Sequence, residues 1–253
     1  MHIPRIRIMP ILMADVSAAL TLQTWMSAAF PTGAFSCSHG METLIADGRI
    51  TDADNCESWI AGILEYGSGW NDAVLTMSAF STMQALLPDS HATKLHENAL
   101  PLETLQTSLH TVNELALALC AGSERRREST QLGQSFARAA AATSRHSVLA
   151  LIDHEICLPI AIGAQGALSN IPVDSLLPAS LQASSSNLVW ICTRLIPLGQ
   201  TQALTIISNL QPLIIRTAQR ARQSSLDDLG SCTLLADLAS IEHEQLPSRI
   251  CIT

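Results

Sequence analysis

Apolar residues recur along most of this chain at spacings of three and four positions, which is the period of a helix with one buried face. The clearest stripe begins after Pro101, includes Leu105 and Leu109, and ends at Gly122. No Asn-Gly or Asp-Gly pair stands between alternating apolar runs, as it does in a β-hairpin. The spacings predict helices over 16–30, 51–67, 71–87, 101–122, 123–142, 148–157, 159–168, 174–196, 200–210, 212–223 and 232–244.

We therefore expect an all-α, single-domain bundle of roughly ten helices, in which short connections make neighbouring helices antiparallel. The predicted boundaries are an N-terminal extension over 1–15 that need not be ordered, a helical domain over 16–244, and a C-terminal tail over 245–253. The apolar run at 8–13 is too short for the core of a signal peptide. No run reaches the roughly 18 apolar residues that cross a bilayer, so we expect no membrane partner.

Composition narrows the class of partner. Of the 253 residues, 47% are hydrophobic and only 14% are charged, so apolar surface is either packed inside a large core or offered to a partner, and a homodimer is expected. The net charge of -8 argues against nucleic acid, and the basic run Arg125-Arg126-Arg127 is interpreted as a solvated helix face. Seven cysteines without a C-x-x-C pair predict reduced thiols and a cytoplasmic location.

Catalytic and metal-binding patterns are weak. No two of the eight histidines stand three or four positions apart, the spacing that would place both on one helix face, so we expect no metal site and no cofactor. No phosphate-binding loop and no nucleophile elbow are present. A cysteine hydrolase that uses Cys37 with His39 is kept as a minor alternative, although residues two apart rarely face each other. The sequence predicts a protein that is not an enzyme.

A set of charged or polar residues remains in apolar, proline- and glycine-rich surroundings. Such residues are either paired inside the fold or presented to a partner, and the sequence favours neither. The candidate partner-binding residues are Glu42, Arg194, Gln200, His243, Glu244 and Arg249. The candidate turn residues are Pro31, Gly33, Gly40, Pro197, Gly199 and Gly230.

Several short sequence motifs, in this order along the chain, resemble those of the family of the urease accessory protein UreF. They are Phe30 to Ser36 with Gly40 to Glu42, Arg127-Glu128-Ser129 with Gly133, Ser186 to Gln200, Asp227 to Ser231, and the tail residues His243, Glu244, Ser248 and Arg249. The tail departs from the family pattern at Glu242 and Pro247, and Cys37 stands where an aromatic residue is common.

The resemblance implies an all-helical, dimeric scaffold that binds UreD (also called UreH), recruits the GTPase UreG, and with them delivers nickel to apo-urease. Glu42 and Arg194 match charged positions near the surface that faces the GTPase, and the tail matches a segment that orders against UreD. An alternative within the same pathway is a regulator that stimulates the GTPase by donating Arg194 to the nucleotide.

Overall fold

The computed structural model describes residues 9–85, 102–144, 146–152 and 155–253. These residues form ten α-helices and three short 3-10 helices, and the described part contains no strand, which confirms the all-α class. In chain order the elements are α1 (Met9–Trp25), η1 (Ala34–Ser36), α2 (Met41–Ala46), α3 (Ala53–Tyr66), α4 (Ser68–Gln84), α5 (Leu102–Ala118), α6 (Ser123–Ala141), η2 (Val148–Ala150), α7 (Leu158–Leu168), α8 (Val173–Leu195), α9 (Gln200–Arg222), η3 (Leu226–Asp228) and α10 (Leu234–His243).

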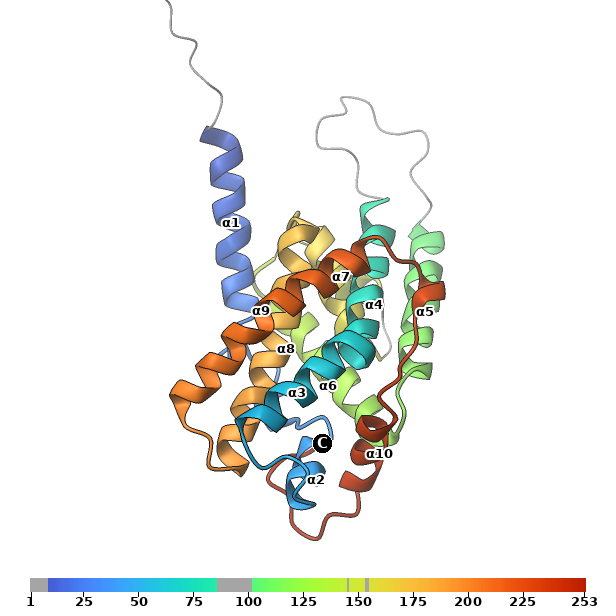
Figure 1. Cartoon of the computed structure of the whole chain (residues 1–253). Helices are drawn as coiled ribbons and strands as arrows, with labels where there is room; N and C mark the ends of the chain where they lie inside the picture. Colours follow the sequence, from blue (N-terminus) through green and yellow to red (C-terminus); the bar gives the residue numbers. More distant parts are fainter. Residues whose placement is uncertain (1–8, 86–101, 145, 153–154) are drawn as a thin grey trace, which may run out of the picture.

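Two groups of buried side chains form the core. One lies among α3, α8 and α9 and includes Ile60, Leu177 and Ile206. The other lies among α4, α6 and α7 and includes Phe136 and Ile160. Helix α1 projects from one side of this body (Figure 1). Among the described residues, none of the helices combines the length and the hydrophobicity that a membrane span requires.

Helix α7 is the central element and is buried on all sides from Pro159 to Ala167. A helix in that position has no side that faces solvent, and its sequence is apolar except for Gln165, whose side chain bonds to the backbone of Val148 and His146. Its approach to α4 depends on a glycine: a Cβ added to Gly163 would lie 2.2 Å from the carbonyl oxygen of Thr76. The close backbone contact fixes α4 against α7.

Two segments depart from the expected pattern. The helix predicted over 148–157 is only the 3-10 turn η2. Asn113 on α5 explains the difference, because its side chain donates to the Glu155 carbonyl at 2.7 Å and accepts from the Cys157 amide at 2.9 Å. Those backbone groups are thereby satisfied without a helix. Residues 153–154 of this prediction lie outside the described residues.

The helices predicted over 200–210 and 212–223 are one helix, α9, with Pro212 inside it. A proline within a helix removes one hydrogen bond, and here the buried neighbours Leu210, Leu213 and Ile214 hold both halves in line against the core. Helix α1 begins at Met9, within the range assigned to the extension, and residues 1–8 lie outside the described residues. The short helix α2 was not predicted at all, since its six residues are too few to show a period.

Candidate functional site

Residues 245–253, the tail, leave α10 and return to the N-terminal part of the chain, so that the C-terminus lies beside α2 (Figure 1). There the tail meets residues 33–38, which we call the turn segment. The Ile252 amide donates to the Ser36 carbonyl at 2.8 Å, and the Ser38 amide donates to the Thr253 carbonyl at 2.6 Å. The end of the tail is therefore paired with the turn segment through backbone groups.

The carboxylate of Glu42 holds the next part of the tail. It lies in the first turn of α2, is 6% exposed, and accepts the amides of Ile250 at 2.6 Å and Cys251 at 2.9 Å. Burial by itself raises the pKa of Glu42, but the Ile250 amide and His243 together hold this pKa below its usual value. Because both amide donors are backbone groups, these bonds do not depend on the side chains of the tail.

A glycine brings α2 close enough to α10 for this arrangement. Gly40 precedes α2 with φ +77°, and a Cβ at this position would lie 2.7 Å from the backbone nitrogen of Ser240. Thr43 adds a bond from its hydroxyl to the Ala239 carbonyl at 3.0 Å. The close approach of the two helices places Glu42 opposite the end of α10.

His243, in the last turn of α10, is fully buried between two carboxylates. Its Nε2 lies 3.0 Å from Glu42 and its Nδ1 lies 2.7 Å from Glu124 on α6. Arg249 of the tail donates to the other oxygen of Glu124 at 2.7 Å, with its own side chain 40% exposed. We call Glu42, Glu124, His243 and Arg249 the latch cluster, because it joins α2, α6, α10 and the tail.

A second charged cluster lies beneath the end of the tail. Glu128 on α6 is 3.0 Å from Arg125 and 3.4 Å from His39, and it accepts from the Thr253 hydroxyl at 3.3 Å. Arg125 also contacts Asp72 on α4 at 3.1 Å. Burial by itself raises the pKa of Glu128, but Arg125 and His39 lower this pKa to about 2. Glu128 is thus a buried anion that binds the tail.

The sequence interpretation of this part of α6 was wrong in part. Arg125 belongs to the second cluster and does not lie on a solvated face, whereas Arg126 and Arg127 are exposed. The residues that sequence reasoning missed are Glu124 and Glu128. Their signal was the four-residue spacing that continues through the buried Leu132 and Phe136, which places both carboxylates on the inner face of α6.

The predicted partner-binding residues divide into two groups. Glu42, His243 and Arg249 come together in the latch cluster, so their first partners are within the chain. Arg194, Gln200 and Glu244 are exposed: Arg194 donates to the Phe35 carbonyl, Glu244 accepts from Ser123, and Gln200 is the first residue of α9. Whether any of them binds another protein stays a prediction.

The predicted turn residues occupy the chain reversals around these clusters. Gly33 has φ +83° and starts η1, and Gly40 has φ +77° at the start of α2. Pro31 precedes the turn segment, Pro197 and Gly199 separate α8 from α9, and Gly230 donates its amide to Asn71 at 2.9 Å before α10. Trp70 strengthens the same region, since its indole donates to the Asp228 carbonyl at 2.9 Å.

The minor alternative of a cysteine nucleophile finds no support in the geometry. Cys37 is buried, and burial together with Glu128 raises its pKa to about 11, which disfavours the reactive thiolate. Both nitrogens of the His39 ring have other partners, Ser68 at 2.7 Å and Glu128 at 3.4 Å. Among the described residues, no three His, Cys, Asp or Glu side chains are placed to hold a metal ion.

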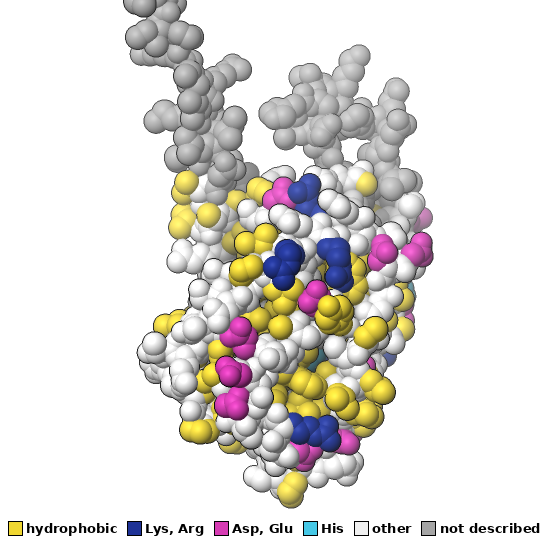
Figure 2. All heavy atoms as spheres, viewed as in Figure 1, with side chains coloured by type: hydrophobic (Ala, Val, Ile, Leu, Met, Phe, Trp, Pro, Cys, Tyr) yellow, Lys and Arg dark blue, Asp and Glu magenta, His cyan; other side chains and the backbone are white. Residues whose placement is uncertain are grey.

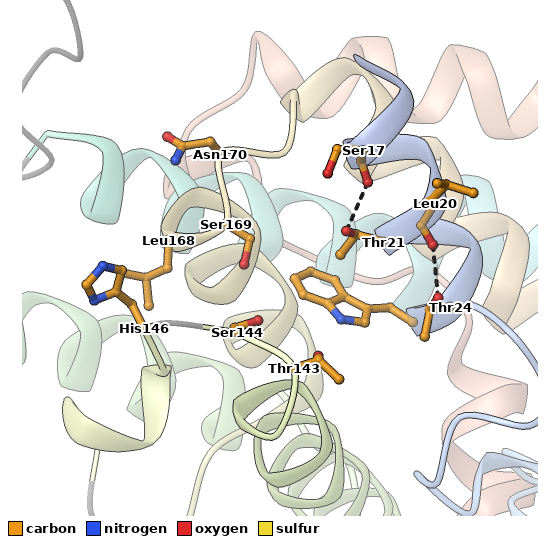
Figure 3. Close-up of a pocket in the computed structure, with 11 residues that line it drawn as sticks. Ser17, Leu20, Thr21, Thr24, Thr143, Ser144, His146, Leu168, Ser169 and Asn170 are labelled. Atoms are coloured by element: carbon orange, nitrogen blue, oxygen red, sulfur yellow. Dashed lines mark hydrogen bonds between the residues drawn. The ribbon is translucent and has the colours of Figure 1, made fainter. Parts of the chain in front are cut away.

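The surface of the described residues includes an apolar face on α10 and an open pocket beside α1. Leu234, Leu235, Leu238 and Ile241 of α10 are 41–67% exposed, and apolar side chains gather in that part of the surface (Figure 2). The pocket, of about 700 Å³, lies between α1, the end of α6 and the end of α7. Trp25 and several hydroxyl side chains line it (Figure 3). It contains none of the clustered charges described above.

Comparison with known proteins gives a consistent result. The family model UreF matches residues 50–211. Among curated proteins, the urease accessory protein UreF of Cereibacter sphaeroides is 37% identical over 92% of this chain and 97% of its own length. The UreF proteins of Agrobacterium fabrum and Mesorhizobium japonicum are 38% and 36% identical, over 94% and 92% of this chain and 97% and 95% of their own lengths. The chain therefore belongs to the UreF family of urease accessory proteins.

Proposed function

We propose that this chain is a cytoplasmic, non-catalytic scaffold of urease maturation. In this proposal it binds UreD/UreH, recruits the GTPase UreG, and with them delivers nickel to apo-urease. The nickel is cargo of the assembled complex, and the chain itself needs no cofactor. Membership of the UreF family is the observation that carries the proposal.

The use of charge in the fold supports a scaffold. Glu42, Glu124 and His243 are buried and bonded to one another or to the tail, so they hold the chain's own C-terminus in one place. A tail fixed by buried ionic bonds presents a defined surface, which reduces the ordering entropy that a partner must overcome on binding. This is the property that a docking platform requires.

Arg194 and the neighbouring turn segment are our candidates for the surface that faces the GTPase. The Arg194 guanidinium is exposed at the end of α8 and is bonded to the Phe35 carbonyl, while the Phe35 ring is 64% exposed beside it. Arginine and aromatic residues are the types that most often dominate binding energy at interfaces. An Arg194→Ala variant should weaken UreG recruitment and leave the melting temperature nearly unchanged.

The alternative role for Arg194, as an arginine finger, gives a separate signal. If the chain stimulates the GTPase directly, single-turnover GTP hydrolysis by UreG should accelerate on addition of the chain and lose that acceleration with Arg194→Ala. The scaffold proposal expects hydrolysis by UreG to show no acceleration that depends on Arg194. The two roles therefore differ in a rate that can be measured without urease.

We also propose that the chain is a homodimer within the complex. The exposed apolar side chains of α10, with Val16 and Leu20 on α1, provide apolar area that a single copy leaves uncovered. Light scattering on the purified chain, alone and with UreD/UreH, measures the copy number. A strictly monomeric mass in both samples contradicts the dimer.

Complementation tests the proposed function in cells. The chain is expressed in a urease-positive bacterium whose own UreF gene is deleted, and urease activity is measured in medium that contains nickel. We expect activity to return with the full chain and to stay absent with a chain that ends at Ser248, which lacks Arg249 and the bonds to Glu42. Full activity from the empty vector, or none from the folded full chain, contradicts the proposal.

A further inference from the structure

One side chain of α8 reaches the same turn segment that receives the tail. Asn187 is half-buried, and its Nδ2 donates to the Ala34 carbonyl at 2.7 Å and to the Cys37 carbonyl at 3.5 Å. Two turns further along α8, Arg194 donates to the carbonyl between them, that of Phe35. Helix α8 thus holds three of the four carbonyls from Ala34 to Cys37.

The remaining carbonyl of this stretch, that of Ser36, is bonded to the tail. It accepts from the Ile252 amide at 2.8 Å, and the Ser38 amide donates to the Thr253 carbonyl at 2.6 Å. The turn segment therefore connects α8 to the tail. Three of its carbonyls accept from α8, and its Ser36 carbonyl and Ser38 amide pair with the tail. The bonds within the turn segment are short-range, such as the Ser36 amide to the Gly33 carbonyl at 3.1 Å, and they do not connect it to the helices.

We propose that Asn187 is a positioning residue for the tail: it fixes the shape of the turn segment with which residues 252 and 253 pair. An amide side chain suits this role because its NH₂ group has two donors, enough for both carbonyls. The consequence for partner recruitment rests on the proposed function, since it requires that the docked tail supports binding of UreD/UreH or UreG. The positioning itself concerns the isolated chain alone.

Hydrogen exchange on the purified full-length chain tests the positioning. In Asn187→Ala, the amides of Ile252 and Ser38 should exchange about five- to tenfold faster, the factor that corresponds to the loss of one net hydrogen bond. The amides of Ile250 and Cys251, which Glu42 also holds, should change less. Unchanged exchange at Ile252 and Ser38 overturns the inference, whether or not the variant is less stable.

Two matched variants separate positioning from general destabilisation. Ser184→Ala removes an exposed hydroxyl of α8 that bonds only to its own helix, and it should leave the tail amides unchanged. Asn113→Ala removes a buried asparagine that holds the backbone of Glu155 and Cys157 and not the turn segment, so it should lower the melting temperature without a selective effect at Ile252. Selective acceleration at Ile252 in Asn113→Ala overturns a specific role for Asn187.

A binding experiment then separates the two claims. UreG and UreD/UreH are pulled down with wild type, Asn187→Ala, the chain that ends at Ser248, and the variant with both changes. If Asn187 acts through the tail, Asn187→Ala should weaken binding in the full chain and have no further effect in the shortened chain. Equal, additive losses in both backgrounds overturn action through the tail. If Asn187→Ala speeds exchange of the tail amides but does not weaken binding of UreG or UreD/UreH, the positioning stands and the proposed role of the tail in recruitment is wrong.

Discussion

Substitution of Glu42 by glutamine tests most clearly whether the latch cluster stabilises the fold and holds the tail. The carboxylate accepts three bonds, from the Ile250 amide, the Cys251 amide and the His243 ring, at 2.6, 2.9 and 3.0 Å. Glutamine keeps the size of the side chain but replaces one oxygen by an NH₂ group that faces donors. At least one bond is therefore lost, and a buried donor is left without an acceptor.

The magnitude follows from these bonds. A hydrogen bond to a charged group contributes about 1.5–3 kcal/mol, and an unpaired buried polar group costs about 1–3 kcal/mol. We expect Glu42→Gln to lower the free energy of unfolding by about 2–4 kcal/mol. For a chain of 253 residues, that corresponds to a fall in melting temperature of roughly 5–15 °C.

The assay pairs thermal melts with hydrogen exchange of the tail. Glu57→Gln is the matched control, since Glu57 has the same chemistry but makes a partly exposed bond to Asn209 at 3.0 Å, so its cost should stay under about 1 kcal/mol. If Glu42→Gln has the melting temperature of the wild type and the amides of Ile250 and Cys251 keep their protection from exchange, the tail is not held by this carboxylate.

Three further results are expected. The folded-state pKa of Glu128 is lowered from 4.5 to about 2, so its contribution to stability is complete above about pH 4.5 and is lost as the pH falls toward 2. Urea melts from about pH 6 to about 2.5 should show this loss of stability. In Glu128→Gln, stability should depend less on pH over the same range. Gly133→Ala should destabilise the chain by about 3 kcal/mol in urea melts, since its Cβ would lie 2.1 Å from the carbonyl oxygen of Ile156, and unchanged stability contradicts that close contact. A thiol reagent should modify the exposed Cys232 well before the buried Cys37, whose pKa is about 11, and mass spectrometry that finds Cys37 modified first is incompatible with its burial.

Elements with a clean period were predictable from the sequence. The stripe that contains Leu105 and Leu109 is α5, and the helix predicted over 159–168 is α7. Helix α2 and the segment after η2 were not predicted, because their conformations depend on distant partners. Asn113 determines the second of these, from a helix more than 40 residues away.

The candidate site was predictable as a set of residues but not as an arrangement. Proline and glycine around Glu42 and Arg194 marked both as unusual, and the sequence left open whether they were paired or presented. Pairing is decided by which elements meet, and here a glycine at position 40 allows α2 to approach α10. Glu128 was overlooked because the arginines next to it made its helix face look solvated, whereas its spacing from Leu132 and Phe136 points inward.

We propose that this chain is required for nickel to reach urease. The most direct measurement is the nickel content of purified apo-urease after incubation with UreD/UreH, UreG, GTP and nickel, with and without this chain, determined by mass spectrometry of the repurified enzyme. We expect nickel and urease activity above the spontaneous background only when the chain is present, and a loss of both with the chain that ends at Ser248. Equal nickel content with and without the full-length chain would contradict it.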